Sequence, residues 1–311
     1  MKFPKLTRRL FMTVAFSLLA AVAAPICASA PLRADEPEYQ EIRDIVYKKV
    51  GDREIKLNLF LPVEDGQIVK GRPLLIYISS GCWNCLGAGD GGVWTSLGAR
   101  KRGFAIASVA HRPISEAIFP APIEDVRAAV RFLRKHAQEY GYDPDRFAAT
   151  GTSSGGHLSL CLGVSDAASI YDVGENLDVS GQVQRVIDFF GPADFVDACT
   201  RRQEQPGCIF DALGVARDAA DPESPEYDAL MERGRKFSPI VYVDADYAPT
   251  FLLHGAEDPV VSLSQSVLMY EQLVMNGVRT RIHVGDGGVH DPRTLGSVNF
   301  LAREIFEFLQ W

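Results

Sequence analysis

The chain has 311 residues, of which 47% are hydrophobic and 23% charged, and its formal charge is −8. This length allows one large α/β domain or two small ones, and the composition is that of a soluble globular enzyme rather than a disordered or fibrous chain. The excess of acidic residues argues against nucleic acid or an anionic membrane surface as a partner.

Residues 1–30 have the three parts of an export signal. Basic residues come first, an apolar stretch covers 10–26, and Ala28-Ser29-Ala30 follows. The pair Arg8-Arg9 ahead of the apolar stretch is typical of a twin-arginine signal. A permanent N-terminal anchor is the alternative, because the stretch is about long enough for a marginal membrane span. The small residues favour cleavage, between positions 28 and 34.

Cleavage would remove four cations and take the formal charge from −8 to −12. We therefore expect a periplasmic or secreted protein with no stable membrane insertion after cleavage. An oxidising compartment permits disulfides among the five remaining cysteines, Cys82, Cys85, Cys161, Cys199 and Cys208. Cys199 and Cys208 flank a loop with proline and glycine and are the favoured pair. Cys82 and Cys85 lack a second Cys/His pair nearby, which argues against a metal site.

The rest of the chain predicts a flexible start at 31–40 and then one domain over 41–311. Residues 42–50 and 54–61 alternate apolar with polar side chains around Gly51-Asp52, which predicts a β-hairpin. Short apolar runs then predict buried parallel strands at 73–78, 104–110, 147–150, 186–190, 250–253 and 280–284.

Helical patterns separate these strands. The clearest has a 3-4-3-4-3 spacing of apolar residues over 123–140, with most of its basic side chains on the other face, and ends at Gly141. A closing helix is expected at roughly 294–309. Strands alternating with helices predict an α/β fold, with a mostly parallel sheet that an antiparallel hairpin opens and helices on both faces.

Residues 195–238 interrupt this alternation. They contain three prolines, scattered acids and two of the cysteines, with weak periodicity. An insertion over one end of the sheet, forming a partial cap, is one interpretation, and a surface excursion without a role is the other.

The sequence G-T-S-S-G-G at 151–156 lies between a predicted strand and a predicted helix. G-x-S-x-G in this context is typical of a nucleophile elbow, in which a strained turn exposes the central serine and small neighbours let strand and helix approach. The central position is Ser153, although Ser154 carries a hydroxyl beside it. A small-residue turn that only packs a helix on a strand is the alternative.

Six histidines allow the base to be chosen by elimination. Two precede Ser153, against the order serine, acid, histidine that an elbow of this kind requires. Three others lie in a helix or strand, where structural roles are expected. His290 alone lies in a glycine-rich loop between the last strand and the closing helix. We therefore predict that His290 is the general base for Ser153.

The acid that orients His290 should follow the preceding strand. Asp258 comes just after 250–253, and Glu257 beside it is the residue that could be mistaken for it. A turn-forming aspartate before Pro259 is the structural alternative. The oxyanion would be stabilised by the N–H of Ser154 and by donors from the loop at 79–83, which follows an early strand.

Together these stretches resemble the hormone-sensitive-lipase-like branch of α/β hydrolases, above all bacterial xylan acetyl or feruloyl esterase-like carboxylesterases. The matching stretches are 119–125, 142–146, 151–157, 188–192 and 254–260. The resemblance implies the α/β-hydrolase fold and a serine esterase that needs no cofactor, with Ser153, Asp258 and His290 catalytic.

One departure from the family concerns the oxyanion loop. The family has His-Gly-Gly-Gly-Trp where this chain has S-S-G-C-W at 79–83. Gly81 and Cys82 could still donate their backbone N–H groups, but Ser80 and Cys82 accept unusual backbone angles less readily than glycines. A Cys82–Cys85 disulfide is one way of bracing this loop. Trp83 is a candidate for substrate binding.

The expected reaction is hydrolysis of a small-molecule or polysaccharide ester through an acyl-enzyme, possible substrates being acetyl or feruloyl esters. A prolyl-oligopeptidase-like serine peptidase shares the core and the order of the triad, although 280 or so mature residues leave no room for the propeller domain such enzymes usually add. A catalytically inert binding protein with the same fold is the other alternative, and only the altered oxyanion loop favours it.

Overall fold

The computed structural model describes residues 38–311 except 86, 90–91, 93–96 and 201–206. All of them belong to one structural unit that covers Glu36–Trp311. The expected export signal at 1–30 lies outside the described residues. Among the helices that are described, none is both long enough and apolar enough to cross a bilayer.

The predicted hairpin is confirmed, and it is longer than expected. Strand β1 (Glu38–Val50) pairs antiparallel with β2 (Arg53–Glu64), and the turn at Gly51 takes a positive φ of 58°. Residues 38–40 were expected to be flexible, and this is wrong, because β2 extends to Glu64 and gives them a partner: Glu38 pairs with Val63.

One sheet contains all the described strands, in the order β1-β2-β5-β4-β6-β7-β8-β9, with β3 paired to β2. From β5 onward along this order neighbouring strands are parallel, and β2 is antiparallel to both of its long neighbours. The predicted strands are confirmed with small changes at their ends. The remaining strands are β3 (Gln67–Ile68), β4 (Arg72–Ile78), β5 (Ala105–Val109), β6 (Tyr142–Thr152), β7 (Arg185–Phe189), β8 (Thr250–Gly255) and β9 (Thr280–Gly285).

Helices cover both faces of this sheet. One core contains alternate residues of β4, such as Leu74 and Ile76, together with apolar side chains of helices α2, α4 and α8. The other contains the intervening Leu75 together with helix α9. The helices outside the insertion are α2 (Ala121–Lys135), α3 (Ala137–Tyr140), α4 (Ser154–Gly163), α8 (Ser264–Met275) and α9 (Val298–Phe308), and the 3₁₀ turns are Arg100–Arg102, Arg217–Ala220, Pro239–Tyr242 and Pro292–Thr294.

The helix expected over 123–140 is interrupted at His136, where φ is −101° and ψ is 11°, and it ends at Gly141 as predicted. Two of its basic residues do not lie on a solvated face. Arg127 and Arg131 are 0% and 1% exposed and pair with Asp172. A buried guanidinium requires such partners, which lie 41 and more residues away along the chain and are not evident from periodicity.

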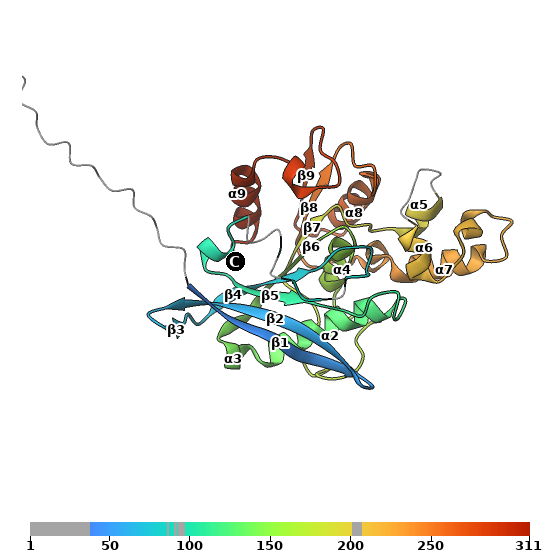
Figure 1. Cartoon of the computed structure of the whole chain (residues 1–311). Helices are drawn as coiled ribbons and strands as arrows, with labels where there is room; N and C mark the ends of the chain where they lie inside the picture. Colours follow the sequence, from blue (N-terminus) through green and yellow to red (C-terminus); the bar gives the residue numbers. More distant parts are fainter. Residues whose placement is uncertain (1–37, 86, 90–91, 93–96, 201–206) are drawn as a thin grey trace, which may run out of the picture. The chain divides into compact units, whose positions relative to one another are not determined.

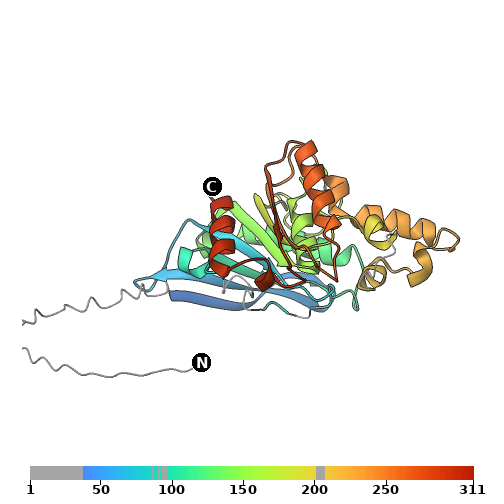
Figure 2. The same cartoon turned by 90° about the horizontal axis from the view of Figure 1, so that it is seen from above.

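The insertion at 195–238 is mostly helical. It contains α5 (Phe195–Thr200), α6 (Cys208–Leu213) and α7 (Tyr227–Phe237), which Figures 1 and 2 show grouped at one side of the sheet. It packs on the loop that follows β4, because Phe195 and Phe237 belong to the same buried core as Trp83.

Candidate active site

The turn between β6 and α4 places Ser153 at the carboxyl end of the sheet. Ser153 has φ 54° and ψ −122°, a conformation that L-residues rarely adopt, and its N–H donates to the carbonyl of Phe189 at 2.8 Å. Ser154 begins α4. This is the strained strand–turn–helix arrangement that the sequence predicted.

Glycines allow this turn to pack tightly against two neighbouring strands. A Cβ added to Gly155 would overlap the carbonyl oxygen of Ile78 at the end of β4, and one added to Gly156 would overlap the carboxylate of Asp188 in β7. The first turn of α4 therefore contacts the start of the loop that follows β4. The glycines are required by close approach, as expected for an elbow.

Asp258 and His290 are in direct contact. His290 Nδ1 lies 2.7 Å from Asp258 Oδ2, and the other carboxylate oxygen, Oδ1, accepts the N–H groups of Val260 and Val261 at 2.8 and 2.9 Å. Burial alone would raise the pKa of Asp258, but the hydrogen bonds from His290, Val261 and Val260 outweigh burial and lower it. Asp258 is thus held as a carboxylate, whereas the side chain of Glu257 is exposed.

The loop that carries His290 is fixed to the end of β8. The N–H groups of Ala256 and Glu257 donate to the carbonyls of Gly285 and Gly288 at 2.9 and 2.8 Å. A Cβ on Gly255 would overlap the backbone of Gly288. Backbone contacts therefore set the position of His290 relative to Asp258.

The Phe189–Phe190 segment at the end of β7 lies next to both Ser153 and His290. The Phe189 carbonyl accepts the Ser153 N–H, and the Phe190 ring centroid is 4.4 Å from that of His290. Phe190 itself has a positive φ of 45°. In the described residues no hydrogen bond joins the Ser153 hydroxyl to His290; such bonds often tighten only when substrate is bound.

The rings of the other five histidines have backbone partners. Each has a ring nitrogen within 3.0 Å of a backbone carbonyl: His111 on Arg112, His136 on Phe132, His157 on Phe237, His254 on Val261 and His283 on Leu295. His254 has a further role that sequence reasoning missed. It is fully buried, and its Nε2 lies 3.5 Å from Asp258 Oδ2, so it packs against the catalytic acid candidate. Its only signal in the sequence is the four-residue spacing from Asp258.

The loop after β4 has an unusual backbone. Gly81, Cys82 and Trp83 have φ values of 102°, 54° and 56°. Within the described part of the chain, no acceptor takes the N–H of Gly81, Cys82 or Ser154. These are the three N–H donors that the sequence predicted for the oxyanion.

Trp83 is 1% exposed, which corrects the expectation that it binds substrate. Its indole N–H donates to His157 Nδ1 at 3.3 Å, and its ring meets the rings of Phe119 and Phe195 edge to face. We call Trp83, Phe119, His157, Phe195 and Phe237 the aromatic cluster. It buries the end of the oxyanion loop instead of lining an open surface.

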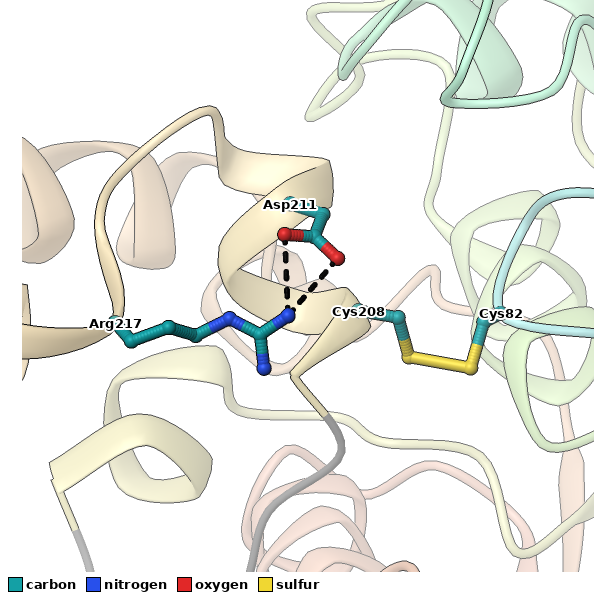
Figure 3. The surroundings of a disulfide bond; sticks show 4 residues. All are labelled: Cys82, Cys208, Asp211 and Arg217. Carbon is teal, nitrogen blue, oxygen red and sulfur yellow. Dashed lines mark hydrogen bonds and ion pairs between the residues drawn. A yellow bond between two sulfur atoms is a disulfide. The ribbon is translucent and has the colours of Figure 1, made fainter.

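The disulfide partner of this loop is Cys208 (Figure 3). The expected pairs Cys199–Cys208 and Cys82–Cys85 are therefore both wrong, and among the described cysteines Cys85, Cys161 and Cys199 are free thiols. Cys208 is the first residue of α6, which the fold of the insertion brings to Cys82 across a separation of 126 residues. Spacing in the sequence carries no signal for such a contact.

The sheet order, the elbow and the acid–histidine pair define the class: the chain has the α/β-hydrolase fold. A family model confirms the resemblance. Residues 57–273 match the BD-FAE family, so this chain belongs to the BD-FAE family of α/β hydrolases.

Known relatives agree with this assignment. The chain is 29% identical over 195 residues to the probable carboxylic ester hydrolase LipM of Mycobacterium tuberculosis, covering 59% of this chain and 43% of that protein. It is 26% identical over 272 residues to the ethyl acetate hydrolase of Pseudomonas putida, covering 86% and 79%. The chain spans about half the length of the first curated relatives it matches.

Among solved structures, a truncated carbohydrate esterase from gut microbiota superposes with a TM-score of 0.72 at 26% identity. The match covers 88% of this chain and 98% of the other. An esterase of Thermogutta terrifontis matches with a TM-score of 0.65 at 22% identity, which supports the fold alone.

The aromatic cluster predicts a pH dependence of stability. Burial lowers the pKa of His157 from 6.5 to about 4 and outweighs the hydrogen bond to the Phe237 carbonyl, which raises it. The neutral ring accepts the indole N–H of Trp83 at Nδ1 and donates from Nε2 to Phe237. The unfolded chain therefore binds the proton at a higher pH than the folded one. Stability from this group is complete above pH 6.5 and falls by about 3 kcal/mol as the pH drops to about 4.

Urea unfolding of wild type and His157→Gln between pH 7.5 and 4 measures the pH-dependent contribution of His157 to the free energy of unfolding. The variant should be less stable at pH 7 but lose less stability on acidification. His111 and His254 contribute in the same direction, since burial lowers their pKa too, so a slope remains in the variant. If the free energy of unfolding depended on pH identically in both proteins, His157 would not be the source of this effect.

Proposed function

We propose that this protein is a serine carboxylic-ester hydrolase that acts through an acyl-enzyme, with Ser153 as nucleophile, His290 as base and Asp258 as the orienting acid. The observation that carries the proposal is the placement of Ser153, strained at the elbow, on the same sheet end as the bonded pair of Asp258 and His290. The names of the relatives, which are carboxylic ester hydrolases and esterases, support the same reaction.

In the first half-reaction the Ser153 hydroxyl attacks the ester carbonyl carbon, and His290 takes the hydroxyl proton at Nε2. The carbonyl oxygen becomes negatively charged and accepts hydrogen bonds from the N–H groups of Gly81, Cys82 and Ser154. His290 then gives its proton to the leaving alcohol, and an acyl-Ser153 ester remains. Asp258 stabilises the imidazolium without taking its proton.

In the second half-reaction His290 removes a proton from water, which attacks the acyl group. Collapse of the intermediate returns the proton to Ser153 and releases the carboxylic acid. The mechanism uses side chains and backbone N–H groups of this chain alone. Preorganised N–H donors contribute most where water is excluded.

For the substrate we propose acetyl or feruloyl esters of polysaccharides. The likeness to a carbohydrate esterase, at 26% identity over 88% of this chain, supports this choice. Export to the periplasm or the medium, proposed from residues 1–30, would bring the enzyme to such polymers.

Loss of the nucleophile tests the mechanism. Ser153→Ala should lower kcat toward a nitrophenyl ester by several orders of magnitude, on the order of 10⁴ or more, with an unchanged fold by circular dichroism. Ser154→Ala removes the neighbouring hydroxyl, which has no partner among the described residues, and keeps the N–H that the mechanism uses. Its turnover should stay far above that of Ser153→Ala. The reverse order, or full activity in Ser153→Ala, would make Ser153 the wrong nucleophile.

Asp258→Asn tests the proposed role of Asp258 as the acid that orients His290. Asp258 Oδ1 accepts two backbone N–H groups, so the amide oxygen of asparagine must occupy that position and its NH₂ must face His290 Nδ1. His290 then carries its proton on Nε2 and cannot accept one from Ser153. We expect a loss in kcat of roughly 10³–10⁴. Glu257→Gln changes the exposed neighbour and should leave kcat near wild type; equal losses in the two variants would contradict the role of Asp258.

A substrate panel tests the specificity. We expect turnover of acetyl and feruloyl esters and release of acetate from acetylated xylan, with Ser153→Ala as the blank. Octanoyl esters and aminoacyl-proline amides complete the panel. Hydrolysis confined to the amides would indicate a peptidase, and hydrolysis confined to octanoyl esters would exclude polysaccharide esters as the substrate.

A further inference from the structure

The backbone of the oxyanion loop needs an external constraint. Gly81, Cys82 and Trp83 follow one another with positive φ, and only Gly81 lacks the Cβ that makes this conformation unfavourable. Such residues persist where the surrounding structure holds them. For Trp83 that constraint is evident, since the aromatic cluster buries its ring and its carbonyl accepts the N–H of Ile114 at 3.0 Å.

For Cys82 the constraint is the disulfide. Its Cα lies 5.7 Å from that of Cys208, at the start of α6. Helix α6 is itself held in place, because the Ala212 carbonyl accepts the N–H of Phe119 at 3.1 Å. Figure 3 shows α6 beside the disulfide, with the guanidinium of Arg217 directed at the carboxylate of Asp211. Arg217 Nη2 lies 3.1 Å from Asp211 Oδ2. The disulfide therefore ties Cys82 to α6, a helix that is held in place by its own hydrogen bond to Phe119.

We propose that the Cys82–Cys208 disulfide is a positioning element of the oxyanion hole, which holds Cys82 in the left-handed conformation that a glycine would adopt freely, and that its reduction lowers turnover. The inference rests on the proposed function, because it concerns the N–H groups of Gly81 and Cys82. Cys208 touches no reacting atom and acts through Cys82.

Reduction is a two-electron exchange. A dithiol such as dithiothreitol attacks one sulfur as a thiolate, the bond between the Cys82 and Cys208 sulfurs breaks, and both become thiols while the reagent closes to a cyclic disulfide. Two electrons and two protons pass from reagent to protein. Without the cross-link Cys82 leaves its strained conformation, and the loop relaxes away from the geometry that the oxyanion requires.

Two of the free thiols do not complicate this exchange. Cys161 and Cys199 are buried, and burial raises the pKa of both, that of Cys199 to about 12. Neither forms an appreciable thiolate near neutral pH. Cys85 is partly exposed and close to Cys82 in sequence, so every variant should also be made with Cys85→Ser, which removes exchange within the loop.

The test compares three variants of the full chain at temperatures below their thermal unfolding transitions. Cys208→Ser should lower kcat about 10- to 100-fold with a small change in KM, which is the scale for misplaced catalytic groups. The double variant Cys82→Gly, Cys208→Ser lacks the disulfide but has a residue that accepts a φ near 54° without a cross-link. It should recover most of the lost kcat. Cys199→Ser, a buried cysteine outside the disulfide, should follow wild type.

Dithiothreitol gives a second measurement that needs no variant to fold. It should lower kcat of folded wild type, reversibly on reoxidation, and leave the double variant unaffected. The proposal is overturned if Cys208→Ser or the reduced enzyme turns over at the wild-type rate, or if the double variant is no faster than Cys208→Ser. The last result would mean that the disulfide matters only for holding the insertion.

Failure of the proposed function has a different signature. If untreated wild type neither hydrolyses the ester panel nor reacts with a fluorophosphonate at Ser153, the esterase assignment fails before the disulfide is tested. If wild type is active and the variants do not differ, the assignment stands and only the role of the disulfide is wrong.

Discussion

The close approach of α4 to β4 is the contact on which the rest of the site depends. Gly155 touches the carbonyl of Ile78, so no side chain fits between the elbow helix and the strand that leads into the oxyanion loop. This backbone-to-backbone contact fixes the Ser154 N–H relative to Gly81 and Cys82. Protein interiors transmit such constraints because they are packed to the density of organic crystals. The turn that carries Ser153 and the end of β4 are therefore held in direct contact.

The pair of Asp258 and His290 is built by a separate set of contacts at the other side of Ser153. Asp258 is desolvated yet remains ionised, because its two oxygens accept hydrogen bonds from His290 and from two backbone N–H groups. Hydrogen bonds to the charged form outweigh burial here. Asp188 shows the opposite balance: it is fully buried, accepts one N–H from Gly191, and burial raises the pKa of its carboxyl well above the usual range.

The sequence was sufficient to predict where a residue lies when its position depends on local chain geometry or on strand order. Ser153 follows from a five-residue pattern, and parallel strands bring the segments after β8 and β9 to one sheet edge, where Asp258 and His290 meet. It was insufficient where contacts join distant segments without a periodic signal. Cys208 reaches Cys82 only through the path of the insertion, and the buried Arg127 pairs with Asp172 in a loop. Helix α8 was missed as well, since its apolar and polar residues are weakly segregated.

Strained backbone conformations are concentrated at the candidate site. Of seven non-glycine residues with positive φ in the described chain, three are Asp44, Asp65 and Asn176, types that tolerate it. The other four lie at the site: Cys82, Trp83, Ser153 and Phe190. Each such residue costs about 1–3 kcal/mol, against a net stability of about 5–15 kcal/mol for a domain. The site persists because aromatic burial, glycine contacts and a cross-link that closes a long loop offset this strain. Stability and the placement of the reactive groups therefore depend on the same contacts.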